Sequence, residues 1–413
     1  MISKRFRRGL AISIEGVPDQ TTVSAVPISR VAFYGPDFRG LRPDVLVEEH
    51  ERVFVGTALF SDRKRPEIKV TSPVSGRVSE ISIGSRRRLA SITVQVEGEE
   101  PIEFDTASMS HRELLLESGL LARMTARPFG SVPDPARTPE ALFVSAMDTA
   151  PGAADPGPIV RNQAEAFGRG LDALADLTDG PVYVCFDDVG PDIPELGRAR
   201  PVKISGLHPA GLSGTQIDLV QPLRGGAEVW QIQAQDVIAF GDLLATGAVS
   251  GKRIVALSGP GVKNPRLVQV PMGAHVAEMM ADNVAEGRWK ALSGPAIGGV
   301  ESAALRRDHL QVSVVPRVEP GVGRLRRLLP TPTRPPKPEA FVPTRAIDLA
   351  LGPDIPVVPL LRALSVGDVE TADRLGVRAL LEEDMALVTY ASGGKQDFGI
   401  LLRRVLDQIE EAA

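Results

Sequence analysis

The amino-acid sequence predicts a multidomain protein of mixed α/β and α+β class. Its 413 residues divide, as a prior, into roughly two to four domains of ordinary size. Hydrophobic residues make up 43% of the chain, enough for several cores, while 40 glycines and 35 prolines favour short strands and turns over long helices. The apolar pattern also changes along the chain, from period-two alternation to continuous runs and finally to helical spacing. Each change marks a predicted domain.

Residues 1–104 form the first predicted domain, in which short strands alternate with polar turns. A strand at residues 53–60, a charged turn, and a second strand at residues 68–78 with a Pro-x-x-Gly corner resemble the barrel-sandwich hybrid fold of biotinyl and lipoyl carrier domains. A carrier domain would bear its modified lysine at the hairpin tip, close to Lys64. The residues that normally frame such a lysine are missing, so the sequence favours a solvated charged turn over a carrier function.

Residues 105–251 form the second predicted domain, a Rossmann-like α/β unit. Two continuous apolar runs, residues 141–147 and 181–186, are separated by a segment with helical spacing, which is typical of buried parallel strands. Ligands bind beyond the carboxyl ends of such strands, where three carboxylates follow the two runs: Asp148, Asp187 and Asp188. Carboxylates at these positions also cap helices, and capping is the favoured interpretation.

Three further segments complete the chain. Residues 252–315 are β-rich and suit a small β-grasp (SLBB-like) domain. Residues 316–343 are a basic, Pro-rich linker, which stays extended because proline disrupts helices and strand ladders. Its cations could bind lipid headgroups or an acidic partner, but a solvated linker is the favoured interpretation. Residues 344–413 have helical spacing and predict a C-terminal helical domain.

The composition and motifs exclude several kinds of function. A net charge of −5 is the wrong sign for a nucleic-acid-binding protein. The single cysteine, Cys185, cannot form a disulfide within the chain, ligate an Fe–S cluster or build a cysteine-based zinc site, and its apolar neighbours predict an inert, buried thiol. The five histidines lack metal-site spacing, and a dinucleotide fingerprint after a strand is absent. We therefore predict neither catalytic residues nor a metal or Fe–S site on this chain.

The apolar runs are also too short for a membrane protein. None approaches the ~18–20 consecutive apolar residues that a membrane-spanning helix requires. Residues 1–8 are basic, but the apolar segment after them is short and ends at Glu15 without a cleavage site of small residues. We therefore expect neither a signal peptide nor a transmembrane segment, so membrane association would depend on a partner.

A glycine-rich loop at residues 206–216 is the candidate ligand-binding segment. Closely spaced glycines allow a flat or anionic ligand to approach backbone N–H groups, and histidine and threonine side chains can donate hydrogen bonds. The candidate residues are His208, Gly211, Ser213, Gly214 and Thr215. The alternative, that the glycines only satisfy turn geometry, carries equal weight.

The order of these domains, together with short motifs along the chain, resembles a known family. The motifs lie at residues 8–10, 146–149, 208–211, 257–260 and 382–387, and they match the A subunit of the Na⁺-translocating NADH:quinone oxidoreductase. That family is similar to the cluster-carrying component of the Rnf complex and to the flavin-binding component of respiratory complex I. Two features depart from its pattern: Ser392-Gly393 replaces a Cys-Pro pair, and residues 316–343 are shorter and richer in proline.

The resemblance implies a function that the residues alone do not. Complexes of this family oxidise NADH, reduce ubiquinone and export Na⁺, with flavins and a 2Fe–2S centre in other subunits. It implies that this chain is a peripheral subunit of this translocase at the cytoplasmic face of the bacterial inner membrane, without a tightly bound cofactor and not catalytic alone. Ubiquinone is then the expected ligand of the loop containing His208. Two alternatives remain open: a stand-alone lipoyl or biotinyl carrier, and a soluble NADH-binding oxidoreductase.

Overall fold

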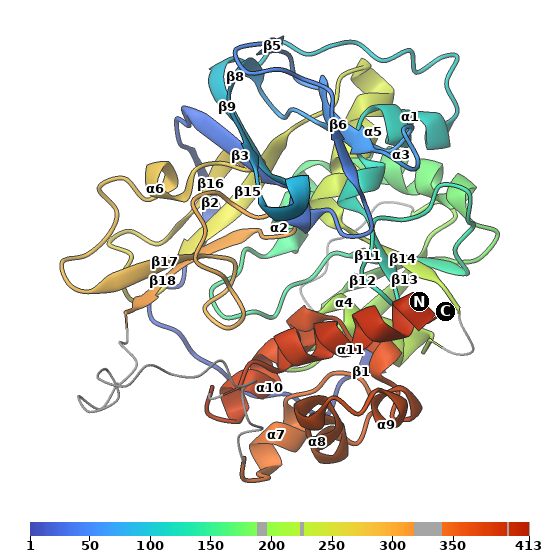
Figure 1. The fold of residues 1–413 in the computed structure, drawn as a ribbon, viewed down its shortest axis with the longest axis vertical. Coiled ribbons are helices and arrows are strands. Elements are labelled where there is room, and N and C mark those ends of the chain that lie inside the picture. Colours follow the sequence, from blue (N-terminus) through green and yellow to red (C-terminus); the bar gives the residue numbers. More distant parts are fainter. Residues whose placement is uncertain (188–195, 224–226, 318–340, 395, 413) are drawn as a thin grey trace.

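The structure is a computed structural model that describes residues 1–187, 196–223, 227–317, 341–394 and 396–412 (Figure 1). Asp188 and most of the predicted Pro-rich linker lie outside these described residues. The described part contains four sheets and a group of C-terminal helices. The predicted fold class is confirmed, because barrel-sandwich, α/β, mixed β and helical parts all occur.

The barrel-sandwich part consists of two small antiparallel sheets. The four-stranded sheet has the order β3-β9-β8-β5 and the three-stranded sheet the order β4-β6-β7. Their apolar faces share a core that includes Leu59, Phe60 and Val78, while Lys64 is exposed in the turn between β6 and β7. The strands are β3 (Arg30–Tyr34), β4 (Pro43–Val45), β5 (Arg52–Val53), β6 (Ala58–Asp62), β7 (Lys69–Thr71), β8 (Ser75–Ile83) and β9 (Leu89–Gly98), with short 3-10 turns η1 (Gly35–Asp37) and η2 (Ser85–Arg87).

The α/β part is built on a six-stranded sheet of order β1-β13-β12-β11-β14-β10. All neighbouring strands are parallel except β10, which runs antiparallel to β14. The strands are β1 (Ile2–Arg5), β10 (Thr125–Arg127), β11 (Ala141–Ser145), β12 (Val182–Phe186), β13 (Arg200–Ser205) and β14 (Val229–Gln233). The helical elements are α1 (His111–Glu117), η3 (Leu121–Arg123), α2 (Pro156–Asn162), α3 (Ala164–Leu174), η4 (Ala175–Leu177), α4 (Ser213–Val220) and α5 (Ala234–Thr246). The two apolar runs predicted as parallel strands are thus β11 and β12.

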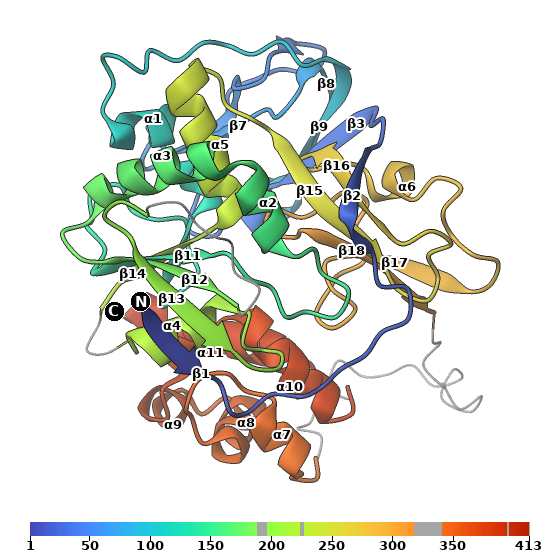
Figure 2. The same cartoon turned by 180° about the vertical axis from the view of Figure 1, so that it is seen from behind.

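The two faces of this sheet have separate cores. Leu142 and Val144 of β11 point toward α3 and α5, in the same cluster as Phe167 and Val237. The alternate residues of β11 and β12, with the fully buried Cys185, face the side covered by α4 (Figure 2). Burial raises the pKa of the Cys185 thiol, because the thiolate would lose its hydration. The thiol is therefore inert, as the sequence predicts.

The fourth sheet has five strands in the order β17-β18-β15-β16-β2. Its central pair, β15 and β18, is parallel, and antiparallel strands β16 and β17 flank it. The elements are β2 (Asp19–Ala25), β15 (Lys252–Ser258), β16 (Arg266–Pro271), α6 (Val276–Met279), β17 (Trp289–Ser293) and β18 (Gln311–Pro316). Strand β2 pairs with β16, and β1 pairs with β13, so the first 25 residues join two sheets outside the barrel sandwich.

The C-terminal helices pack against each other around a separate core and lie beside the α/β sheet (Figures 1 and 2). They are α7 (Arg345–Leu349), α8 (Val357–Val366), α9 (Val369–Arg374), η6 (Val377–Ala379), η7 (Glu382–Met385), α10 (Ala386–Ala391) and α11 (Phe398–Ala412). Asp368 caps α9 by accepting from the Thr371 N–H at 3.0 Å. Ser392 donates to the Thr389 carbonyl at 2.8 Å. Within the described residues, no helix combines the length and apolar character needed to cross a membrane.

Candidate functional site

A cavity of about 370 Å³ lies at the carboxyl end of the six-stranded sheet. Three chain segments line it, which are the residues that follow β1, the loop that follows β11, and the residues that follow β13. The lining residues are Leu10, Ala11, Ile12, Ser13, Thr149, Gly206, Leu207 and His208. Because β1, β13 and β11 are parallel, all three segments leave the sheet at the same edge, which is where α/β sheets bind ligands.

His208 is one of three residues with a polar side chain that line the cavity, together with Ser13 and Thr149. Its backbone carbonyl accepts a hydrogen bond from the Leu10 N–H at 2.9 Å, which ties the loop to the segment after β1. The imidazole Nδ1 lies 3.2 Å from the Thr149 hydroxyl. The residue is only 8% exposed, and this burial lowers its pKa to about 4. His208 is therefore a neutral imidazole at neutral pH.

Thr149 links His208 to the glycine-rich loop. Its hydroxyl oxygen accepts a hydrogen bond from the Gly211 N–H at 2.8 Å. The side-chain amide of Gln216 donates to the Gly211 carbonyl at 3.0 Å and to the Ser145 hydroxyl at 2.9 Å. The loop is thus held from both sides of Gly211, which fixes the position of the imidazole.

Gly211 is needed for space rather than for an unusual backbone angle. Its φ is not among the positive values found in this chain. A Cβ atom at Gly211 would lie 2.4 Å from the Thr149 nitrogen, a distance that real Cβ atoms do not reach. A side chain here would therefore push the loop away from Thr149.

The other predicted site residues lie in the first turn of α4, where Gly214 and Thr215 face the C-terminal helical part. A Cβ atom at Gly214 would lie 2.4 Å from the Asp384 carboxylate, and Thr215 is fully buried close to Gly352. Ser213 is half-buried at the start of the helix. The structure thus brings His208 and Gly211 together around Thr149, whereas the lining of the cavity does not include Ser213, Gly214 or Thr215.

An ion-pair cluster holds the C-terminal helices against the edge of the sheet. The Arg127 guanidinium, on β10, donates to the Asp384 carboxylate at 3.0 Å and to the Glu383 carboxylate at 2.8 Å. It also donates to the Gln231 side-chain oxygen at 2.7 Å and to the Ala379 carbonyl at 3.1 Å. The Arg127 side chain has no exposed surface and that of Asp384 only 1%. These bonds fix the position of Asp384, which Gly214 of α4 approaches closely.

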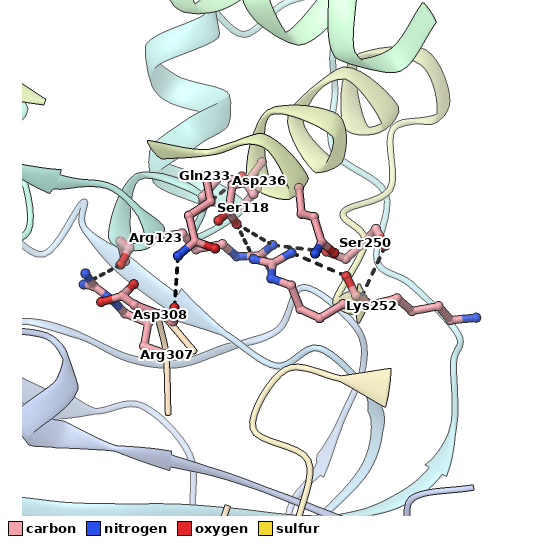
Figure 3. Close-up of polar contacts among 12 residues, drawn as sticks. Ser118, Arg123, Gln233, Asp236, Ser250, Lys252, Arg307 and Asp308 are labelled. Atoms are coloured by element: carbon pink, nitrogen blue, oxygen red, sulfur yellow. Dashed lines mark hydrogen bonds and ion pairs between the residues drawn. The ribbon is translucent and has the colours of Figure 1, made fainter. Parts of the chain in front are cut away.

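A second buried polar cluster joins the α/β part to the β-grasp sheet (Figure 3). Asp236, in the first turn of α5, accepts a hydrogen bond from Arg253 and lies 3.6 Å from Arg123. Burial, together with the charge of Arg253, lowers the pKa of Arg123 to about 10, so the side chain stays protonated. Arg307 extends the cluster by donating to Thr125 at 2.7 Å. The cluster's hydrogen bonds join chain segments to one another, so its role is structural.

Of the three carboxylates predicted at the strand ends, Asp148 and Asp187 belong to the described residues. Asp148 is exposed, and its carboxylate accepts from the Ala150 N–H at 2.7 Å, which stabilises the turn after β11. Among the described residues, no group of three or more His, Cys, Asp or Glu side chains could hold a metal ion. His208 is a candidate site residue predicted from the sequence, whereas Thr149 and Arg127 are not. Thr149 belongs to a motif at the end of a predicted strand, which could have indicated it.

Comparison with known domain families defines the class of protein. Residues 5–97 match the model of the NqrA N-terminal barrel-sandwich hybrid domain, residues 107–249 the NqrA second alpha/beta domain, and residues 254–303 the NQRA C-terminal domain. The chain is therefore a multidomain protein of the type formed by these three domains in series.

Full-length relatives identify the family. The A subunits of the Na(+)-translocating NADH-quinone reductases of Vibrio anguillarum, Pseudomonas aeruginosa (strain UCBPP-PA14) and Pasteurella multocida (strain Pm70) are each 37% identical to it, across 98% of this chain and 99% of theirs. The chain belongs to the NqrA family, the A subunits of Na⁺-translocating NADH-quinone reductases, which confirms the resemblance found in its motifs. A structure of an NAD⁺-reducing [NiFe]-hydrogenase covers 74% of this chain and 64% of its own at 13% identity, but its TM-score of 0.37 is too low to inform fold or function.

Proposed function

We propose that this chain is the peripheral NqrA component of a Na⁺-translocating NADH:ubiquinone oxidoreductase, in which it contributes to ubiquinone binding and to assembly of the complex. Its identity to NqrA proteins over nearly its whole length supports the place in the complex. One observation carries the quinone role: a buried, neutral imidazole, His208, lines a cavity at the carboxyl end of the parallel sheet.

The chemistry of the cavity suits a quinone headgroup. A quinone presents two carbonyl oxygens, which accept hydrogen bonds, on a flat apolar ring. His208 supplies a ring nitrogen at the wall, and Leu10, Ile12 and Leu207 supply apolar surface around it. The volume of about 370 Å³ is within the usual range for small-molecule sites. Gly211 keeps the loop close to Thr149, so the imidazole is held in place before a ligand binds.

The proposal divides the work among subunits. Flavins, a 2Fe–2S centre and the Na⁺ path belong to partner subunits, and NADH:ubiquinone reduction is an activity of the whole translocase. This chain supplies no catalytic residue and no tightly bound cofactor. It lies at the cytoplasmic face of the bacterial inner membrane, attached through its partners. Gly214 and Thr215 then serve the site indirectly, because they pack α4 against the C-terminal helical part.

The test is the substitution His208→Ala in the assembled complex. Loss of a buried hydrogen-bond donor costs about 1–3 kcal/mol, so we expect the KM for ubiquinone to rise by roughly 5- to 150-fold. Oxidation of NADH with an artificial electron acceptor should be unchanged, because that step precedes the quinone. His208→Gln, which retains a side-chain N–H donor, should be less impaired than His208→Ala.

The matched control is His111→Ala. His111 lines a different cavity in the same α/β part, where it pairs with Asp176 at 2.8 Å. This variant removes the same chemical group without touching the proposed quinone site, so its KM for ubiquinone should match wild type. An unchanged KM in a folded, fully assembled His208→Ala complex would refute the quinone role.

A further inference from the structure

The Thr149 hydroxyl occupies a position between two groups that constrain its single hydrogen. The Gly211 N–H lies 2.8 Å from the hydroxyl oxygen on one side, and the His208 Nδ1 lies 3.2 Å from it on the other. A backbone N–H can only donate, so toward Gly211 the hydroxyl is an acceptor. Among the described residues, these are the two hydrogen-bond partners of the Thr149 hydroxyl.

The hydrogen count then decides which nitrogen of His208 is protonated. If the hydroxyl donates to Nδ1, both contacts of the hydroxyl are hydrogen bonds, and the single hydrogen of the neutral imidazole lies on Nε2, which is left free to donate to a ligand or to water in the cavity. If Nδ1 instead carried the hydrogen, the hydroxyl would accept twice and its own hydrogen would have no partner. A donor without a partner costs about 1–3 kcal/mol when it is buried, and Thr149 is half-buried. The first arrangement is therefore favoured.

We propose that Thr149 is a positioning residue that fixes His208 in the Nε2–H tautomer and so presents a hydrogen-bond donor to the cavity. Nε2 has no hydrogen-bond partner among the described residues, and His208 lines the cavity. A donor at this position recognises a ligand with a carbonyl acceptor. The inference rests on the proposed function for the identity of that ligand, ubiquinone, but the tautomer itself is a property of the free chain.

The experiment is ¹⁵N NMR of the histidine side chains in the full chain at neutral pH. His208→Gln assigns the His208 signals by their disappearance. We expect Nε2 to show the shift of a protonated nitrogen and Nδ1 that of an unprotonated one. Thr149→Val should convert His208 to a mixture of tautomers, while Thr149→Ser, which keeps the hydroxyl, should retain the single tautomer.

The matched control is Thr178→Val in the same α/β part. The Thr178 hydroxyl also accepts from a backbone N–H, that of Gly180 at 2.9 Å, and donates to the Pro139 carbonyl at 2.6 Å, without contacting His208. Its loss should leave the His208 tautomer unchanged.

Two readouts separate failure of this inference from failure of the proposed function. Protonation of Nδ1 in the wild-type chain, or a single Nε2–H tautomer retained in Thr149→Val, would overturn the role of Thr149 whatever the quinone does. In the assembled complex, Thr149→Val should raise the KM for ubiquinone several-fold, less than His208→Ala does, and Thr149→Ser should restore it. A tautomer change with an unaltered KM would leave the tautomer assignment standing and overturn the presentation of a donor to ubiquinone.

Discussion

Arg127 offers the sharpest test of how the C-terminal helices are attached. The substitution Arg127→Met keeps much of the side-chain length but removes a guanidinium that makes four hydrogen bonds, two of them to Asp384 and Glu383. Asp384 is almost completely buried, so the variant leaves a carboxylate without its cationic partner in a dry environment. Removing one member of a buried ion pair typically destabilises a protein by about 3–5 kcal/mol.

We expect this loss to appear as a lower free energy of unfolding in denaturant. Relative to wild type, hydrogen–deuterium exchange should accelerate more in α10 and α11 than in β11 and β12. Arg137→Met is the control, because Arg137 is 66% exposed in its pair with Glu228 and exposed pairs contribute about 0–1 kcal/mol. The double variant Arg127→Met with Asp384→Leu should recover much of the loss, since apolar replacement of both partners of a buried pair is often near neutral. A loss below about 1 kcal/mol in Arg127→Met would refute the reasoning.

Two further predictions concern the glycine-rich loop at residues 206–216. The pKa of His208 is about 4 in the folded chain against 6.5 for the free side chain, so between these values the unfolded state binds more protons, and the stability that the neutral imidazole contributes above pH 6.5 is lost as the pH falls toward 4. Between pH 7.5 and 5, denaturant unfolding should therefore show that wild type loses about 2 kcal/mol more stability than His208→Gln. Equal losses in the two proteins would contradict this prediction. Gly211→Ala should both lower stability and weaken ubiquinone binding, because the new Cβ would meet the Thr149 nitrogen. An unchanged melting temperature together with an unchanged KM for ubiquinone would show that the loop adapts freely.

The sequence predicts the central strands better than the edges. β11 and β12 were predicted because strands covered on both faces are apolar throughout, a pattern visible within each run. The short strands β1 and β2 pair with β13 and β16, which lie about 200 and about 245 residues further along the chain, respectively. Nothing within four to seven residues encodes a partner at that distance, so pairing of this kind depends on the assembled fold.

The candidate site also combines features that local sequence predicts with features that depend on the assembled fold. His208 was predicted from its glycine-rich loop, because loop composition is a local property. Thr149 was not, since its contact with His208 exists only when the loops after β11 and β13 meet. Gly214 and Thr215 were predicted for a ligand, but the close approach of Asp384 and Gly352 decides what they face. That approach depends on packing of the C-terminal helices, which residue patterns in α4 do not specify.

The most direct test of the quinone site is a titration of the full chain with a water-soluble, short-chain ubiquinone, followed through the imidazole NMR signals of its five histidines. The account predicts a saturable shift of the His208 signals, because Nε2 would donate to a quinone carbonyl, with His50 and His111 unmoved as internal controls. His208→Ala should abolish saturable binding, whereas His111→Ala should retain it. Binding that leaves the His208 signals unmoved and survives His208→Ala would contradict the central claim.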